Sequence, residues 1–504
     1  MYSLSYIKKI AKGAALVLTS MIIGKLFSYL YIILVANKLG SHDYGVLSLG
    51  FAIFSLASAF SLLGLDEGII RFVSFFKGKN DLSSLKGTIL ISLKTVLNTS
   101  IFFSILLIVF SDFISNTIFN EFELTKVLFF LALALPFSAI AQLFLASFRA
   151  FQKPKFEVLI KELIEKFFRL IISALLISLS YKLFGAILGY SLAIFIMFCS
   201  AFIIFNKKIF NLFNKNIESK ENKKELLGYS LPLLLKNLLW FTIGWINILM
   251  LGYFKTTSDV GIYNVALPTS TLLMTPTFSI MYLFLPIISE LYSKNNLNEI
   301  NNVYKKISKY IFMINIPIFL IISLLSKEIV FVLFGNEYLK AVVPLVILSF
   351  GYLAFSLSDI SINTLSVLKK TKIIFAITLL FSLLNAILNY LLIPKYNLIG
   401  ASIATSSSLL IGSILMIVIS YYYTKLHPFA FNYKKLIISL LIPLIIVIII
   451  KKFIILSALI NLIIFTPLIL LVYIISLFTL KVFEEDDIEF LKEIKNKIKF
   501  LIKL

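Results

Sequence analysis

The residues of this sequence that can do chemistry are charges placed inside long apolar runs. Lys25, Lys94 and Lys236 each interrupt a stretch of aliphatic and aromatic residues. A charge near the middle of a bilayer is costly, so it usually faces a water-filled cavity or a partner. Lys25 lies about 12 residues from either end of its run, deeper than a lysine snorkels easily. We expect these lysines to bind an anion; structural pairing for Lys25, and snorkelling for Lys94 and Lys236, are the alternatives.

A second group of charges lies within residues 161–169, also inside an apolar run. Glu162 and Lys166 are separated by four residues, as are Glu165 and Arg169. On a helix such residues are neighbours and neutralise each other in part. The spacing therefore predicts two intrahelical ion pairs, which either face protein or form the polar wall of a water-filled cavity. Arg169 is a further candidate for substrate binding.

Carboxylates are rare inside the apolar runs, and Asp359 is the one deep in the second half of the chain. We interpret Asp359 as a candidate for substrate binding or ion coupling. Asp66, Glu67 and Arg71 follow an apolar run directly, which suits a gate or a helix end. Glu67 and Arg71 have the same four-residue spacing as the pairs above.

Uncharged polar residues inside the runs have a more ordinary interpretation. Asn247, Asn385 and Asn389 are expected to form hydrogen bonds between helices, with a coupling or gating role for Asn247 as the alternative.

Motifs of known enzyme classes are missing from the sequence. It has no Walker-type phosphate loop and no His-Glu-x-x-His, and its two histidines are His42 and His427. Cys199 is the one cysteine, so neither an internal disulfide nor a cysteine metal cluster can form. We expect no cofactor and no metal, and a transporter rather than an enzyme.

The elements that position these charges are membrane-spanning helices. The chain is 60% apolar and only 14% charged, with a mean hydropathy of +1.00, so lipid must be its solvent. About 20 apolar residues cross the hydrocarbon core. The sequence predicts an all-α integral membrane protein with about fourteen such runs, at 13–36, 44–65, 87–110, 126–147, 156–179, 185–205, 229–254, 260–288, 308–326, 341–368, 371–393, 397–424, 435–450 and 454–479.

Loop charges give an orientation. When charges within about five residues of a span end are counted with the adjacent loop, 33 of the 47 Lys and Arg residues belong to the loops of one side and nine to those of the other. The positive-inside rule then predicts a multi-pass protein of the cell membrane with both termini in the cytoplasm. The same rule accounts for the net charge of +22 without nucleic acid.

Internal similarity predicts two lobes. Ser41 to Val46 resembles Thr257 to Ile262, and Asn120-Glu121 resembles Asn336-Glu337, both at an offset of 216 residues. Six helices per repeat give both repeats one orientation, related by an axis along the membrane normal. The predicted parts are an N-lobe (1–206), a cytoplasmic linker (207–228), a C-lobe (229–424), two further helices (425–480) and an amphipathic cytoplasmic tail (481–504). A solvated charged tail is the alternative for the last part.

Several short motifs follow one another along the chain: Leu39-Gly40-x4-Gly45, Gly68-x2-Arg71, Pro232, Met250-Leu251-Gly252, Val260-Gly261-Ile262-Tyr263, Phe334-Gly335-x-Glu337-Tyr338 and Gly400-Ala401-x2-Ala404-Thr405. In order and spacing they resemble the motifs of polysaccharide and O-antigen flippases, members of the multidrug/oligosaccharidyl-lipid/polysaccharide exporter superfamily. The resemblance covers nearly the whole chain. It implies fourteen helices in two six-helix lobes, and transport of lipid-linked sugars by alternating access.

The resemblance also implies partners. The expected substrate is a polyprenyl-diphosphate-linked oligosaccharide for cell-surface glycan synthesis. The protein is also expected to contact membrane lipid, and contact with glycan-assembly enzymes is a further candidate. Members of the family often carry Asp at the position of Asn247, and asparagine cannot cycle a proton, which leaves Asp359 as the coupling candidate. The alternatives are a multidrug or cation antiporter of the same superfamily, which needs an acidic cavity, and a membrane glycosyltransferase or polymerase, which needs large external loops.

Overall fold

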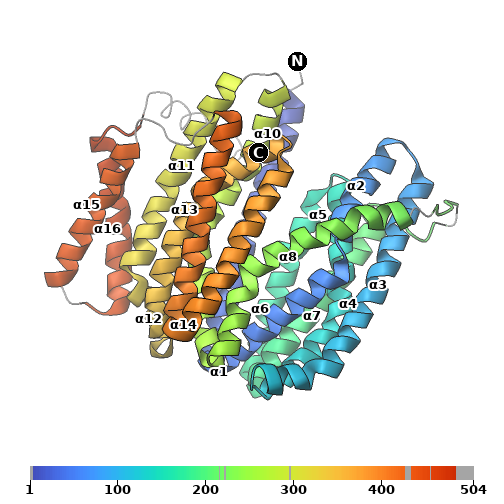
Figure 1. The fold of residues 1–504 in the computed structure, drawn as a ribbon, viewed down its shortest axis with the longest axis horizontal. Coiled ribbons are helices and arrows are strands. Elements are labelled where there is room, and N and C mark those ends of the chain that lie inside the picture. The colour runs from blue at the N-terminus through green and yellow to red at the C-terminus, as the bar shows by residue number, and fades with distance from the viewer. Residues whose placement is uncertain are drawn as a thin grey trace. The chain divides into compact units, whose positions relative to one another are not determined.

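The computed structural model describes residues 4–214, 216–220, 223–293, 297–425, 433–453 and 456–483, and in this part of the chain all regular structure is helical (Figure 1). Most of the predicted tail (484–504) and His427 lie outside the described residues. The first half consists of α1 (Leu4–Leu62), α2 (Leu65–Gly78), α3 (Leu82–Asp112), η1 (Phe113–Ile118), α4 (Glu123–Ala150), α5 (Pro154–Val158), η2 (Leu159–Ile164), α6 (Glu165–Leu176), η3 (Ile177–Tyr181) and α7 (Lys182–Lys208). The second half consists of α8 (Lys223–Phe254), α9 (Thr257–Ser270), η4 (Thr271–Leu273), α10 (Met274–Ser293), α11 (Leu297–Leu324), α12 (Ser326–Phe334), η5 (Asn336–Ala341), α13 (Val342–Val367), α14 (Thr371–Thr424), α15 (Tyr433–Phe453) and α16 (Ala458–Thr479).

The helices have the length and composition of membrane spans. Among the described residues, nine are long and apolar enough to cross a bilayer, or up to ten if a bent pair counts as one span. Three of the nine run for 60, 55 and 54 residues, far more than one crossing needs. Backbone breaks divide them at Gly40 (φ 81°), Ser180 (φ 69°) and Asn397 (φ 51°). These breaks lie at or beside the predicted gaps between spans, while the count of fourteen stays a prediction.

The chain forms two compact units. Unit 1 comprises Met1–Thr269, Leu333–Pro344 and Phe375–Ser408, and unit 2 comprises Ser270–Val332, Leu345–Ile374 and Leu409–Leu504. In unit 1, α3 packs against α4, and α7 packs against both α4 and α6 (Figure 1, blue to green). The division into lobes by repeat, with a linker at 207–228, stays a prediction.

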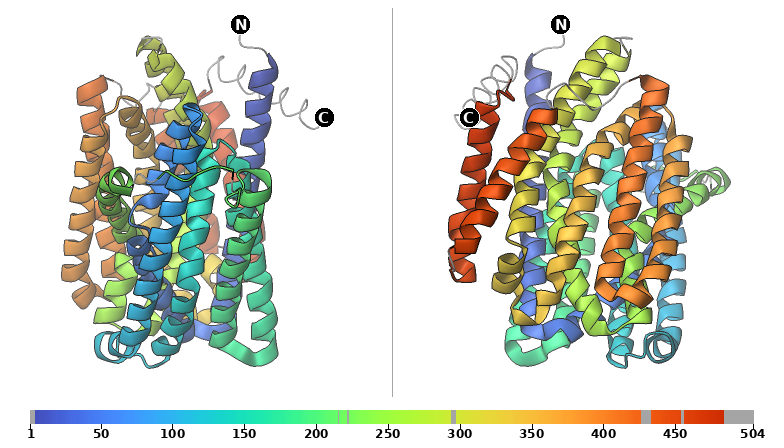
Figure 2. Two further views of the ribbon diagram at one scale, coloured as in Figure 1. Left: turned by 90° about the vertical axis from the view of Figure 1, so that its right-hand side faces the viewer. Right: turned by 60° about the vertical axis from the view of Figure 1, so that its left-hand side comes forward.

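Unit 2 holds the last two helices against α11. Figures 1 and 2 show α15 and α16 side by side, and their apolar faces form one core with Met313, Ile316 and Leu320. The hydroxyl of Tyr473 in α16 donates to the carbonyl of Met313 at 3.0 Å. Apolar packing alone discriminates weakly between helices in lipid, so polar contacts of this kind fix the docking.

An ion pair also attaches these helices to α12. Nζ of Lys451 lies 2.6 Å from Oε1 of Glu328, whose side chain is 8% exposed, and also donates to the carbonyl of Leu324. Asn461 of α16 donates to the same carboxylate oxygen at 3.2 Å. Three helices thus meet at one buried carboxylate.

Replacing Lys451 by alanine is expected to lower the stability of unit 2 by on the order of 3 kcal/mol, because Glu328 would remain buried without a cation. Thermal unfolding of the purified protein in detergent measures the effect. Lys452→Ala is the matched control, since Lys452 is exposed and forms no ion pair with any described residue. Equal melting temperatures for the two variants would contradict the structural role of the pair.

Candidate functional site

A close approach between α1 and η2 brings the predicted charges of the first half together. A Cβ atom on Gly24 would lie 2.6 Å from the carbonyl oxygen of Glu162 and 2.8 Å from its Oε2. Only glycine therefore fits at this crossing. The next residue, Lys25, is thereby placed beside the charged segment of η2 and α6.

The two predicted intrahelical ion pairs are confirmed. Lys166 pairs with Glu162, and Nη1 of Arg169 lies 3.5 Å from Oε1 of Glu165. All four side chains are mostly buried, whereas Lys25 is exposed and forms no ion pair with any residue that the structure describes. We call these five residues the basic cluster. Its three cations face two carboxylates, which leaves one positive charge in excess.

Arg169 is held by aromatic rings as well as by charge. Its guanidinium lies 4.9 Å from the ring centre of Tyr31 and 5.8 Å from that of Tyr190. Its Nη2 also donates to Oγ of Ser28 at 3.3 Å, and Ser28 lies one helical turn after Lys25. Stacking of this kind fixes the plane of an arginine and with it the direction of its N–H groups.

The guanidinium has spare hydrogen-bonding capacity. Nε of Arg169 is buried without a hydrogen-bond partner among the described residues. Buried polar atoms are normally satisfied by protein, water or ligand. The basic cluster therefore has a donor left over for an anion or for water, and its five members include no nucleophile of the Ser, Cys or Thr type.

The other predicted binding lysines lie in different surroundings. Lys236 of α8 forms an ion pair with Glu67 of α2 at 3.2 Å, and both side chains are at least one-third exposed. Lys94 of α3 is exposed and forms no ion pair with a described residue. The structure thus joins Lys25 and Arg169 in one cluster and places Lys236 in a second contact. The binding roles of all four stay predictions.

Asp66, Glu67 and Arg71 follow the second predicted span, and Glu67 does not pair with Arg71 as their spacing suggested. Glu67 takes Lys236 as its partner, while the guanidinium of Arg71 lies 4.2 Å from the ring centre of Tyr229. The ring and the lysine both come from α8, which packs against α2. Oδ1 of Asp66 is buried without a partner among the described residues. Tertiary contacts have replaced the local pair, and the gating role stays a prediction.

Asn247 and Asn389 form a predicted hydrogen bond between helices, whereas the hydrogen bond to Asn385 lies within α14. Nδ2 of Asn389 in α14 donates to Oδ1 of Asn247 in α8 at 2.6 Å and to the carbonyl of Asn385 at 2.8 Å. Asp359 belongs to unit 2, where Nδ2 of Asn363 donates to its carbonyl oxygen at 2.8 Å. No described cation pairs with Asp359, and its coupling role stays a prediction.

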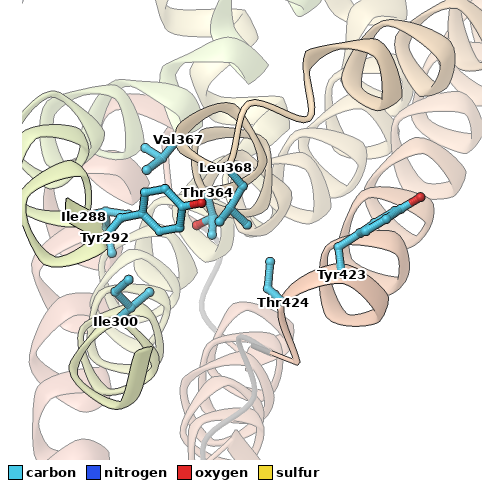
Figure 3. Close-up of a pocket in the computed structure, with 8 residues that line it drawn as sticks. All are labelled: Ile288, Tyr292, Ile300, Thr364, Val367, Leu368, Tyr423 and Thr424. Carbon is cyan, nitrogen blue, oxygen red and sulfur yellow. The ribbon is translucent and has the colours of Figure 1, made fainter. Parts of the chain in front are cut away.

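A pocket of about 240 Å³ lies in unit 2, and none of the predicted site residues lines it. Figure 3 shows its lining, which is mostly apolar with two tyrosines and two threonines: Ile288, Tyr292, Ile300, Thr364, Val367, Leu368, Tyr423 and Thr424.

Residues 10–292, more than half of the chain, match the model of the family described as polysaccharide biosynthesis protein. The chain belongs to this family. Residues 232–391 also match the MatE model. The two matches confirm the resemblance to polysaccharide flippases of the multidrug/oligosaccharidyl-lipid/polysaccharide exporter superfamily.

Individual proteins similar to this chain include a membrane protein and two flippases. An uncharacterized membrane protein of Methanocaldococcus jannaschii is 27% identical over 455 residues, 87% of this chain and 89% of that protein. The probable low-salt glycan biosynthesis flippase Agl15 of Haloferax volcanii is 26% identical over 218 residues, 43% of this chain and 46% of that protein. The structure of the lipid II flippase MurJ in an inward closed conformation matches with a TM-score of 0.75 at 17% identity, over 92% of this chain and 98% of that chain. At this identity the structural match shows the fold.

Sequence reasoning missed the aromatic and hydroxyl members of the site. Tyr31, Tyr190 and Ser28 surround Arg169, yet each is an ordinary residue of an apolar run. Ser28 and Tyr31 follow Lys25 by three and six residues, and this polar spacing is the one local signal that the sequence offers. Tyr190 is 21 residues from Arg169 and belongs to another helix, so no local pattern identifies it.

Proposed function

We propose that this protein is a flippase that moves a polyprenyl-diphosphate-linked oligosaccharide across the cell membrane by alternating access. The observation that carries the proposal is the basic cluster, an excess of positive charge within apolar helices. A charge in that place calls for an anionic partner. The diphosphate of the substrate supplies one.

The chemistry of the cluster suits a diphosphate that must be released again. Lys25 offers an ammonium group that no described carboxylate occupies, and Arg169 offers a guanidinium of fixed orientation. Both bind phosphate oxygens through charge-assisted hydrogen bonds. Glu162 and Glu165 compete with the phosphates for Lys166 and Arg169. This competition keeps the head group from being trapped.

The rest of the substrate needs no dedicated chemistry. The polyprenyl tail stays in lipid, and the oligosaccharide enters the aqueous path. Asp359 is our candidate for coupling transport to an ion. Both termini are cytoplasmic in this proposal, an orientation that the labelling experiment in the next subsection also tests.

A multidrug or cation antiporter would require an excess of carboxylates at the site. The excess in the basic cluster has the opposite sign. We therefore assign an anionic substrate.

The function is tested with purified protein in liposomes that contain a polyprenyl diphosphate carrying a short, fluorescently labelled oligosaccharide. Translocation is followed by adding a membrane-impermeant quencher. We expect the labelled lipid to cross at least about tenfold faster than in protein-free liposomes, a change of about 1.4 kcal/mol in barrier. A fluorescent polyprenol glycoside without the diphosphate is the control and is expected to gain nothing. No acceleration, or equal acceleration of both lipids, would overturn the proposal.

A further inference from the structure

Two equivalent segments of the predicted repeats lie backbone against backbone in unit 1. A Cβ atom on Gly45 would clash with the carbonyl oxygen of Thr257, and one on Gly261 would clash with that of Ser41. Gly45 and Gly261 are 216 residues apart, as are Ser41 and Thr257. The contact is therefore the same in both directions, like the self-complementary interface of a two-fold dimer.

Two carboxylates with the same offset strengthen this contact. Oε2 of Glu121 accepts a hydrogen bond from the hydroxyl of Thr257 at 2.8 Å. Oε1 of Glu337 accepts one from the backbone N–H of Ser41, also at 2.8 Å. Each carboxylate thus binds the first residue of the segment that belongs to the other repeat. We call Glu121 and Glu337 the latch carboxylates.

The break in α1 explains why the carboxylate binds there. Gly40 has φ 81° and ψ 175°, so the helix restarts at Ser41 with N–H groups that have no partner within the helix. A carboxylate at such a helix start satisfies an N–H group and interacts favourably with the helix dipole. Thr257 likewise begins α9, but Glu121 accepts from its side-chain hydroxyl instead of a backbone N–H, and the same carboxylate oxygen lies 3.0 Å from Nε2 of His42.

Further polar contacts extend the same surface. Nδ2 of Asn264 donates to Oγ of Ser48 at 2.7 Å, and these two positions are again 216 residues apart. Nδ2 of Asn37 donates to the carbonyl of Leu333 at 2.6 Å. We call this contact between α1 and the segments of α9, α12 and η5 the repeat seam. It buries Ser48 completely and leaves no room for a side chain at either glycine.

We propose that the repeat seam is the gate on the face that loop charges predict to be external, and that Glu121 and Glu337 are its paired latches. The inference rests on the proposed function, since alternating access requires the repeats to separate on one face while they meet on the other. Hydrogen bonds to charged groups are among the stronger ones, yet each contributes only about 1.5–3 kcal/mol and can break by itself. Two equivalent latches therefore hold a closed state that stays reversible.

The latch is tested by accessibility, which requires no substrate. In a Cys199→Ser background, which removes the chain's single cysteine, Ser48→Cys places one buried thiol in the repeat seam. Its reaction with a membrane-impermeant maleimide added outside whole cells is then measured. Adding Glu121→Ala and Glu337→Ala is expected to raise the reaction rate at least about tenfold, because the two charge-assisted hydrogen bonds across the repeat seam are lost, together with the contact of Glu121 to His42 within its own repeat. An unchanged rate in a folded double variant would overturn the latch. Labelling that occurs only when the maleimide is on the cytoplasmic side would overturn the assigned face.

Cross-linking tests whether the repeat seam must open. Asn37→Cys with Leu333→Cys spans the repeat seam at a hydrogen bond of 2.6 Å and leaves both latch carboxylates intact. A short bis-thiosulfonate linker between them is expected to stop flipping, and dithiothreitol is expected to restore it. Asp112→Cys with Asn116→Cys is the matched pair within one repeat, where the side chains lie 2.7 Å apart. Full flipping by the cross-linked Asn37–Leu333 pair would overturn the gate. If neither the wild type nor any variant flips the lipid, while labelling still depends on the latch carboxylates, the proposed substrate is refuted and the gate is supported.

Discussion

Lys25→Ala is expected to reduce flipping to the level of protein-free liposomes while the protein folds and accumulates normally. Lys25 is exposed and forms no ion pair with a described residue, so its removal leaves no carboxylate unpaired. Removing such a charge from an apolar run should stabilise the fold if it changes it at all. Lys25→Arg keeps the charge with a different geometry and is expected to retain partial activity.

The experiment compares flipping, complementation of a flippase-deficient strain and membrane abundance in parallel. Lys38→Ala is the matched control, because Lys38 lies on the same helix, is exposed and forms no ion pair with a described residue. Full activity of Lys25→Ala would remove Lys25 from the site. Loss of activity together with loss of protein would instead show that Lys25 is structural, with Glu162 as its nearest candidate partner.

Arg169→Gln is expected to abolish flipping and also to destabilise the protein by about 3–5 kcal/mol. The reason is Glu165, whose side chain is only 10% exposed and pairs with Arg169. Without the guanidinium, this carboxylate would stay buried with its charge uncompensated. The contacts of the guanidinium with the rings of Tyr31 and Tyr190 would be lost as well.

A double variant separates the two effects. Glu165→Gln with Arg169→Gln removes both charges, so stability is expected to return to within about 1 kcal/mol of the wild type, since neutral replacement of an ion pair costs little. Flipping is expected to stay absent, because the cation that binds the diphosphate is gone. Normal flipping by the double variant would show that Arg169 is a structural residue. Wild-type stability of Arg169→Gln would show that Glu165 does not depend on it.

The elements and the local pairs of this protein were accessible from sequence for a physical reason. Lipid demands runs of about 20 apolar residues, so the spans are visible as composition. The pairs Glu162–Lys166 and Glu165–Arg169 follow from helix geometry, which places residues four apart on one face. For pairs within one helix, the spacing of the residues along the sequence is enough to predict the contact.

Contacts between helices that are distant in the sequence could not be predicted from it. Glu67 had a local partner in Arg71 and a tertiary one in Lys236, 169 residues away, and the structure takes the tertiary one. The pair of Glu328 and Lys451 was likewise missed, because both residues sit at ends of apolar runs where charges are usual. Helix packing determines these choices, and no spacing rule encodes it.

The break of α1 at Gly40 has a mechanical consequence. Lys25 and Gly40 belong to one uninterrupted stretch of helix, with no backbone break between them. At 1.5 Å per residue they are about 22 Å apart on a stiff rod, so a tilt of about 10° around the Gly40 end displaces Lys25 by about 4 Å. That displacement exceeds the length of a hydrogen bond. Because the break at Gly40 separates this rod from Gly45, the rod can swing while Gly45 stays packed against Gly261. The ammonium group can therefore leave its ligand without opening of the repeat seam.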